Sequence, residues 1–202
     1  MNSIFYQGHA SLRLTTDQGH VVYIDPYAGD GYDQKADLIL VSHQHYDHNQ
    51  IDLPAKNDDC TIWQNFDLLK NGIYQTKTFH EITVEGVEAY NKNHSKNECV
   101  GFLLIFNGLT IYIAGDTSTT DMMRSLKDRH LDYAFLPCDG IYNMDIDEAI
   151  QCADIIQAKH VIPYHTSPQS LFDLNRAQKF KADNSVILRP GETLDLDNTI
   201  II

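Results

Sequence analysis

Four side chains that can bind a metal ion lie within a single six-residue segment of this sequence. The segment His43-Gln44-His45-Tyr46-Asp47-His48 supplies three imidazoles and one carboxylate. Histidine is the commonest metal ligand in proteins, and neutral imidazole suits zinc and other borderline divalent cations. Clustering these groups costs desolvation and backbone freedom, which a bound metal offsets and a packed core does not. The carboxylate favours a site that activates water over a closed structural site.

Several apolar, strand-like runs are followed closely by a polar side chain that could act chemically. The runs and the residues that follow them are 38–41 with His43, 87–90 with His94, 111–114 with Asp116, and 161–163 with His165. Ligand sites in layered α/β proteins gather beyond the carboxyl ends of strands. The sequence therefore predicts one site that unites His43, His45, Asp47, His48, His94, Asp116 and His165.

The elements that must position these residues begin as a sheet-rich half and continue as alternating strands and helices. We expect strands at 3–6, 11–15, 20–25, 35–41, 60–64, 100–106, 109–114, 131–136, 160–163, 185–189 and 199–202. Residues 73–91 should hold two or three antiparallel strands with a turn at Glu85-Gly86, and Asn107-Gly108 is a strong hairpin signal. We expect helices at 66–70 with Asn65 as N-cap and a stop at Asn71-Gly72, and at 120–129, 145–159 and 168–179. No repeat or linker interrupts this order, so residues 1–202 are predicted to form one domain.

The composition narrows the range of partners. The 202 residues carry a net charge of −13, which disfavours nucleic acid and anionic membranes as partners and leaves a small-molecule substrate. The N-terminal residues do not resemble a secretory signal, and no apolar stretch reaches the roughly 18 residues of a membrane span. The four cysteines lie far apart without a C-x-x-C pair, which favours reduced, buried thiols in a cytoplasmic protein. The oligomeric state cannot be read from the sequence.

The ordered set of candidate ligands resembles the metallo-β-lactamase-fold hydrolases. The shared pattern comprises His43-x-His45-x-Asp47-His48, an isolated His94, Gly115-Asp116-Thr117 and Pro163-Tyr164-His165. The segments Gly8-His9-Ala10-Ser11 and Ile24-Asp25-Pro26 are similar to a compact branch that holds the ascorbate-6-phosphate lactonases and many uncharacterised metal-dependent hydrolases. This resemblance implies an α/β fold of the four-layer αββα sandwich type, with the site along one edge.

The resemblance also implies how the ligands divide between two divalent ions. His43, His45 and His94 would bind the first ion, Asp47, His48 and His165 the second, and Asp116 would bridge them. Zinc is the expected metal and manganese the alternative. A hydroxide held between the ions would be the nucleophile, and Asp47 would also serve as the catalytic proton acceptor.

Simpler roles exist for several of these residues. His94 and His165 would each fit an ordinary loop, and Asp116 is a good helix cap. His9 and Asp25 would either support the metal ligands from behind or serve the backbone alone. Asp139 and Tyr142 follow a strand end and would line either the pocket or a plain loop.

We therefore expect a dinuclear metal-dependent hydrolase that acts on a small ester, lactone or phosphoester. Branch resemblance places lactone and carboxylic-ester hydrolysis ahead of a phosphodiesterase activity. A second hypothesis is a non-catalytic, metal-binding or regulatory member of the fold. A third is diiron electron transfer, against which His45 argues because the diiron relatives usually carry Glu at that place.

Overall fold

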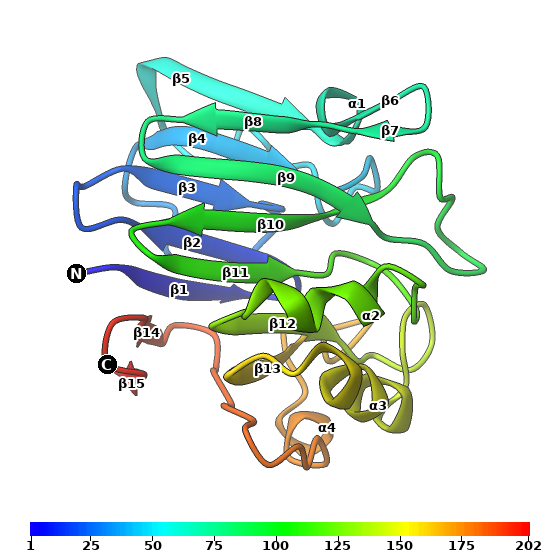
Figure 1. Ribbon diagram of the computed structural model, residues 1–202. Coiled ribbons are helices and arrows are strands. Elements are labelled where there is room, and N and C mark those ends of the chain that lie inside the picture. The colour runs from blue at the N-terminus through cyan, green and yellow to red at the C-terminus, as the bar shows by residue number, and fades with distance from the viewer.

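The computed structural model describes residues 1–202 and contains two β-sheets that pack face to face (Figure 1). The first sheet has the strand order β15-β14-β1-β2-β3-β4-β5. Its strands are β1 (Ser3–Gly8), β2 (Ser11–Thr15), β3 (Val21–Ile24), β4 (Ala36–Val41), β5 (Lys56–Gln64), β14 (Thr193–Asp195) and β15 (Ile200–Ile201). The second sheet has the order β13-β12-β11-β10-β9-β8. Its strands are β8 (Thr76–Phe79), β9 (Ile82–Glu88), β10 (Val100–Phe106), β11 (Leu109–Ile113), β12 (Tyr133–Pro137) and β13 (His160–Tyr164).

Parallel pairing within each sheet brings distant strand ends to a common edge. Strand β3 pairs in parallel with β4, and β11, β12 and β13 form a parallel set. Figure 1 shows the arrowheads of β3, β9 and β11 at the same side of the sandwich, with both chain termini at the opposite side. The loops that follow these strands therefore meet along one edge.

Most of the core lies between the two sheets. Alternating residues of the strands, such as Leu12 and Leu14 in β2 and Phe102 and Leu104 in β10, are fully buried there. Burying one such side chain stabilises the fold by about 1.5–3 kcal/mol. The interior of the sandwich is therefore the main source of stability, and it supports the edge that carries the loops.

The outer faces of the two sheets are covered differently. Helices α2 (Met123–Leu126) and α3 (Ile146–Ile156) pack on the second sheet and bury a second apolar cluster (Figure 1). On the first sheet, Tyr23 and Ile39 are covered by Tyr32 and Ile51 from two loops. The predicted αββα class is confirmed, and loops supply much of the outer layer over the first sheet.

Two predicted turns that contain glycine, Glu85-Gly86 and Asn71-Gly72, have different roles in the structure. Glu85-Gly86 lies inside β9, and the turn falls at residues 80–81 instead. A side chain at Gly86 would come within 2.7 Å of the Leu68 carbonyl oxygen, so this glycine permits close approach rather than a turn. Asn71-Gly72, with positive φ at both residues, is the hairpin turn between β6 (Leu69–Lys70) and β7 (Ile73–Tyr74) and does not end a helix.

All four helices are shorter than predicted; α3, expected over 145–159, ends at Ile156 because Gln157 adopts a left-handed backbone. Helix α1 (Asn65–Leu68) begins with Gln64 as its cap, not Asn65, and residues 120–129 form only α2 and a 3₁₀ turn at Lys127–Arg129. The expected helix 168–179 is reduced to α4 (Leu174–Ala177), because the Ser167 hydroxyl accepts hydrogen bonds from the next backbone amides and holds a loop. Residues 185–189 form a single bridge with β13 rather than a strand, and β14 was not predicted. None of the helices has the length and apolar character that a bilayer span requires.

Candidate metal centre

The loops at the common edge bring all seven predicted ligands together. His43, His45, Asp47 and His48 follow β4, whereas His94, Asp116 and His165 follow β9, β11 and β13. Three sets of side chains place their donor atoms within 4.8 Å of one another: His43 with His45 and His94; Asp47 with His48, His165 and His9; and Asp116 with His43 and His48. The first set contains the three side chains expected at one ion, and the second contains the three expected at the other together with His9.

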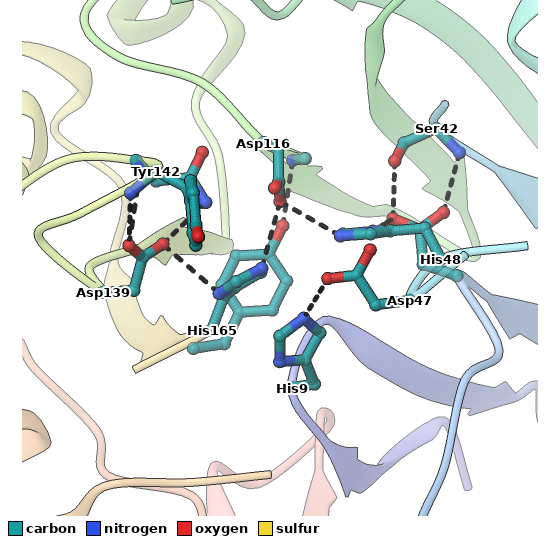
Figure 2. Close-up of polar contacts among 12 residues, drawn as sticks. His9, Ser42, Asp47, His48, Asp116, Asp139, Tyr142 and His165 are labelled. Atoms are coloured by element: carbon teal, nitrogen blue, oxygen red, sulfur yellow. Dashed lines mark hydrogen bonds and ion pairs between the residues drawn. The ribbon is translucent and has the colours of Figure 1, made fainter. Parts of the chain in front are cut away.

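Asp116 lies between the two sets of imidazoles, and Figure 2 shows its carboxylate facing His48 and His165. Its Oδ2 atom is 3.2 Å from Nε2 of His94, and its Oδ1 atom is 3.4 Å from Nε2 of His48 and 3.5 Å from Nε2 of His165. Ligands about 2.1 Å from a tetrahedral zinc ion are separated from each other by about 3.4 Å. Each oxygen of Asp116 therefore has the spacing to share a cation with the imidazole or imidazoles that it faces.

Two imidazoles of the first set are oriented by hydrogen bonds from their Nδ1 atoms. His43 donates from Nδ1 to the hydroxyl oxygen of Ser42 at 3.0 Å, and His94 donates from Nδ1 to Oδ1 of Asn91 at 2.9 Å. The Ser42 hydroxyl must accept from His43 because its own proton goes to Asp25 at 2.6 Å. These contacts place the ring proton on Nδ1 and leave Nε2 free to bind a cation.

A carboxylate lies beside Nδ1 of each imidazole of the second set. His48 donates from Nδ1 to Oδ2 of Asp25 at 2.9 Å, and Nδ1 of His165 lies 3.4 Å from Oδ2 of Asp139. Asp139 is fully buried, and its Oδ1 atom accepts from the backbone amides of Ile141 and Tyr142. Figure 2 shows Asp139 between His165 and the loop that carries Tyr142. Asp139 therefore holds the loop beside His165 and does not line the cavity, whereas Tyr142 does.

Asp25 is the residue that connects the two sets. Its Oδ1 atom accepts from the Ser42 amide at 2.7 Å, while Oδ2 accepts from the Ser42 hydroxyl and from His48. It therefore contacts one imidazole directly and another, His43, through Ser42. The backbone of Asp25 is left-handed, with φ of 46°, a conformation that short polar residues tolerate better than most.

His9 lies behind Asp47 at the edge of the second set. Its Nε2 atom is 3.0 Å from Oδ2 of Asp47, and its ring centroid is 3.8 Å from that of His165 (Figure 2). His9 is buried and also has a left-handed backbone, with φ of 55°. Its contact leaves Oδ1 of Asp47 for a cation and holds the carboxylate in one orientation.

The protonation of the buried groups suits cation binding. Burial lowers the pKa of His43 to about 2 and that of His165 to about 4, so both imidazoles are neutral at pH 7. Burial opposes ionisation of Asp116, but the imidazoles of His165 and His48 hold its pKa well below the usual range. Burial also opposes protonation of His48, yet the Asp116 and Asp25 carboxylates raise its pKa well above 6.5. A cation that binds His48 must therefore displace a proton.

The buried polar atoms at the centre fit a bound metal better than a closed polar network. Nε2 of His43 and His48, both ring nitrogens of His165 and Oδ1 of Asp116 are buried without a hydrogen-bond partner. Leaving a buried polar group unsatisfied costs about 1–3 kcal/mol. Such atoms converging from the three loops after β4, β11 and β13 are the pattern that a metal centre produces.

A cavity opens the centre to solvent. It has a volume of about 540 Å³, and His45, Asp47, His94, Asp116 and His165 form its floor, with Gln44, Tyr46, Asn93, Tyr142 and Pro168 around them. A closed structural zinc site has no such access. The arrangement can therefore admit water and a small molecule to the candidate ligands.

Sequence reasoning missed two residues that orient the imidazoles. Ser42 directly precedes the histidine cluster, and Asn91 precedes His94 by three residues. Small polar residues next to a histidine were the available signal, but such residues are common in loops. Tyr164, which precedes the candidate ligand His165, accepts a hydrogen bond from the Gly115 amide at 2.9 Å.

Comparison with known proteins agrees with this geometry. The family model described as "Beta-lactamase superfamily domain" matches residues 3–165. A UPF0173 metal-dependent hydrolase of Lysinibacillus sphaericus is 30% identical, with coverage of 95% of this chain and 98% of the relative. A crystal structure from Parabacteroides distasonis, described as a metal-dependent hydrolase, is 31% identical with a TM-score of 0.75 and covers 92% of both chains. The metallo hydrolase Igni18 of Ignicoccus hospitalis shares the fold, with a TM-score of 0.75 at 21% identity over 96% of this chain and 97% of that one.

Proposed function

Because this chain belongs to the β-lactamase superfamily and is similar along its length to metal-dependent hydrolases, we propose that it is a dinuclear metal-dependent hydrolase. Its substrate is a small molecule, and carboxylic esters and lactones are favoured over phosphodiesters. Zinc is the preferred metal, because five of the seven candidate ligands are imidazoles. Manganese is the alternative, since the two carboxylates also suit a harder ion.

The placement of Asp116 carries this proposal. One of its oxygens faces His94 and the other faces His48 and His165, at 3.2–3.5 Å. A carboxylate with imidazoles on both sides is what a bridge between two cations requires, and a helix cap does not require it. The open cavity above Asp116 favours catalysis over a purely structural or regulatory metal site.

Two divalent cations, when bound, would lower the pKa of a water molecule toward neutrality and polarise the substrate oxygen. The chain's own residues then have distinct tasks. The imidazoles supply neutral donors, and hydrogen bonds to Ser42, Asp25 and Asn91 fix the orientation of three of them in advance. Asp47 reaches the cavity, and its Oδ2 atom is held by His9. This carboxylate is the group that we assign to accept the proton of the attacking water.

Metal analysis combined with turnover measurements tests the proposal. Purified protein supplied with zinc or manganese should hold two ions per chain and hydrolyse simple carboxylic esters or lactones. The variant Asp116→Ala should lose bound metal and at least about a thousandfold in kcat/KM, because it removes contacts to both ions. Asp121→Ala is the matched control, since Asp121 is exposed and lies outside the site.

The outcomes separate the competing functions. Full activity of Asp116→Ala with two ions retained would show that the bridge assignment is wrong. Tight binding of two ions without turnover on a broad panel of esters, lactones and phosphoesters would favour a regulatory metal-binding protein. Iron as the native metal would favour diiron chemistry instead.

A further inference from the structure

The space above the candidate metal centre contains no positively charged protein side chain. Two smaller cavities adjoin the main one: a cavity of about 270 Å³ shares His45 with it, and a cavity of about 450 Å³ shares Asp47 and Pro168. None of the three cavities has a lysine or arginine among its lining residues. Lys92 and Lys96 lie on the same loop as His94 but do not line these cavities, and Lys96 is held by Glu88 at 2.6 Å. Enzymes that bind phosphate usually place arginine or lysine on its oxygens. This site has only its cations for that purpose.

The charges around the centre nearly cancel. Four carboxylates, those of Asp25, Asp47, Asp116 and Asp139, contact or lie beside the candidate ligands. They balance the four positive charges of two divalent ions, while the imidazoles are neutral when they bind metal. A hydroxide would make the centre net negative by one charge. Such a centre repels an anionic substrate, and the net charge of −13 on the whole chain adds to this effect.

The mouth of the main cavity is aromatic. Tyr46 and Tyr142 line it and are 69% and 51% exposed. The Tyr46 ring packs edge-on against Tyr27, with centroids 5.7 Å apart, so it is supported from behind. The Tyr142 backbone is also fixed, because its carbonyl accepts from Asn91 at 2.9 Å and from Asn93 at 3.1 Å. Exposed aromatic rings at a cavity mouth form a surface for an apolar or aromatic group.

We infer that the site takes an uncharged carboxylic ester or lactone that carries an aromatic or other apolar group, and that Tyr46 and Tyr142 contact this group. The inference rests on the hydrolase function proposed above and adds the charge and shape of the substrate. In the reaction the oxygen of water bonds to the carbonyl carbon and the bond from that carbon to the alkoxy oxygen breaks. The alkoxy oxygen takes up a proton, and the products are an alcohol and a carboxylate with release of one proton.

A series of substrates with one leaving group separates charge from reactivity. Metal-loaded protein is assayed with 4-nitrophenyl acetate, a neutral dialkyl 4-nitrophenyl phosphate, bis-4-nitrophenyl phosphate and 4-nitrophenyl phosphate, each relative to its uncatalysed hydrolysis. One extra negative charge on the substrate, about 8–10 Å from the net negative charge of the centre, should lower binding by roughly a factor of ten or more at an effective dielectric constant of 20. The rate enhancement should therefore fall by about tenfold or more for each added charge. A greater enhancement for either anionic phosphate than for both neutral substrates would overturn the inference.

Side-chain variants locate the effect in the cavity. Asn93→Lys places a cation at the cavity wall and should raise kcat/KM for bis-4-nitrophenyl phosphate relative to the acetate by about tenfold. Gln151→Lys adds the same charge on the exposed side of α3 and should leave this ratio unchanged. Tyr142→Ala should raise KM for an aryl ester several-fold while leaving KM for ethyl acetate nearly unchanged. An equal effect on both esters would refute the assigned aromatic contact.

Binding to the metal-free protein provides a readout that is independent of turnover. At pH 8, calorimetry or saturation-transfer NMR compares 4-nitrobenzamide with 4-nitrobenzoate, which have similar shapes and differ in charge. The amide should bind at least about tenfold more tightly, and Tyr142→Ala should weaken it. Equal or tighter binding of the benzoate would overturn the inference. If no substrate is hydrolysed, the proposed function fails while this comparison still tests the charge of the site.

Discussion

Replacing Asp25 by asparagine tests how one buried carboxylate controls two candidate ligands. Asparagine has the same shape and tolerates the left-handed backbone at this position, with φ of 46°. Alanine at such a φ would add about 1–2 kcal/mol of backbone strain and confuse the result. Asp25→Asn therefore changes charge and hydrogen bonding with the least disturbance of the chain.

The expected magnitude follows from the contacts of Asp25. Its two oxygens accept three hydrogen bonds, from the Ser42 amide, the Ser42 hydroxyl and His48 Nδ1, at 2.6–2.9 Å. In either orientation of the asparagine amide, its NH₂ group faces at least one of these donors. If the neutral His48 ring avoided this clash by moving its proton from Nδ1 to Nε2, the protonated Nε2, which faces Asp116, could no longer bind a cation. Hydrogen bonds to charged groups contribute about 1.5–3 kcal/mol, and loss of such partners lowers metal affinity about 10–100-fold.

Stepwise calorimetric titration of the metal-free protein with zinc measures this effect. Asp25→Asn should weaken the site that contains His48 by about 10–100-fold and the site that contains His43 by less, because Ser42 lies between. Ser42→Ala should weaken only the latter. Asp132→Asn is the control. The Asp132 carboxylate accepts a hydrogen bond from the Thr110 amide at 2.8 Å but lies outside the candidate metal centre, so its replacement should leave metal affinity unchanged. Two ions bound to Asp25→Asn with the affinity of the natural sequence would refute the reasoning.

Three further perturbations have outcomes that the structure specifies. First, the metal-free protein should lose about 2–4 kcal/mol of unfolding free energy between pH 6.5 and pH 5, measured by urea denaturation. The cause is that the folded state keeps His43 and His165 neutral, with pKa lowered to about 2 and about 4, while the unfolded chain takes up protons. The stabilisation from His48, whose pKa is raised, is present in full below pH 6.5 and does not offset this loss. The loss should be smaller in His43→Gln, and a pH-independent stability would contradict these pKa values. Second, zinc binding at pH 7 should release a proton from His48, seen as a calorimetric heat that varies with the ionisation enthalpy of the buffer; equal heats in phosphate and Tris would argue against it. Third, Tyr164→Phe should cost about 1–3 kcal/mol of stability and weaken metal binding, because the buried amide of Gly115, next to Asp116, loses its acceptor; Tyr112→Phe is the control, since the buried Tyr112 hydroxyl has no hydrogen-bond partner.

The strands could be predicted well because their signals are local. Apolar runs such as 100–106 and 109–113 around Asn107-Gly108 have the residue types and the turn that a hairpin requires. The helix at 146–156 was also predictable, with Asp145 accepting from the Glu148 amide as its N-cap. The prediction of a helix over 168–179 was wrong outside α4, because the Thr166 and Ser167 hydroxyls accept from nearby backbone amides and hold residues 168–173 as a loop, while Asp173 caps the short helix.

The sequence by itself determined which groups stand at the ends of strands and in what order. His43, His45, Asp47 and His48 share one loop, so their proximity is a consequence of short chain separation. His94, Asp116 and His165 follow in the same order as the ligands of the metallo-β-lactamase-fold hydrolases. This resemblance, rather than any local pattern, predicted that they share a site with the histidine cluster.

Only the tertiary structure decided which side chain faces which. Segments distant in the chain place His94 on one oxygen of Asp116 and His48 and His165 on the other. They put Asp25 behind the ring of His48 and Asp139 beside that of His165. They also leave the cavity without a lysine or arginine side chain. These features depend on distances of a few ångströms between separate loops, and such distances are set by the packing of the two sheets rather than by any local pattern of residues.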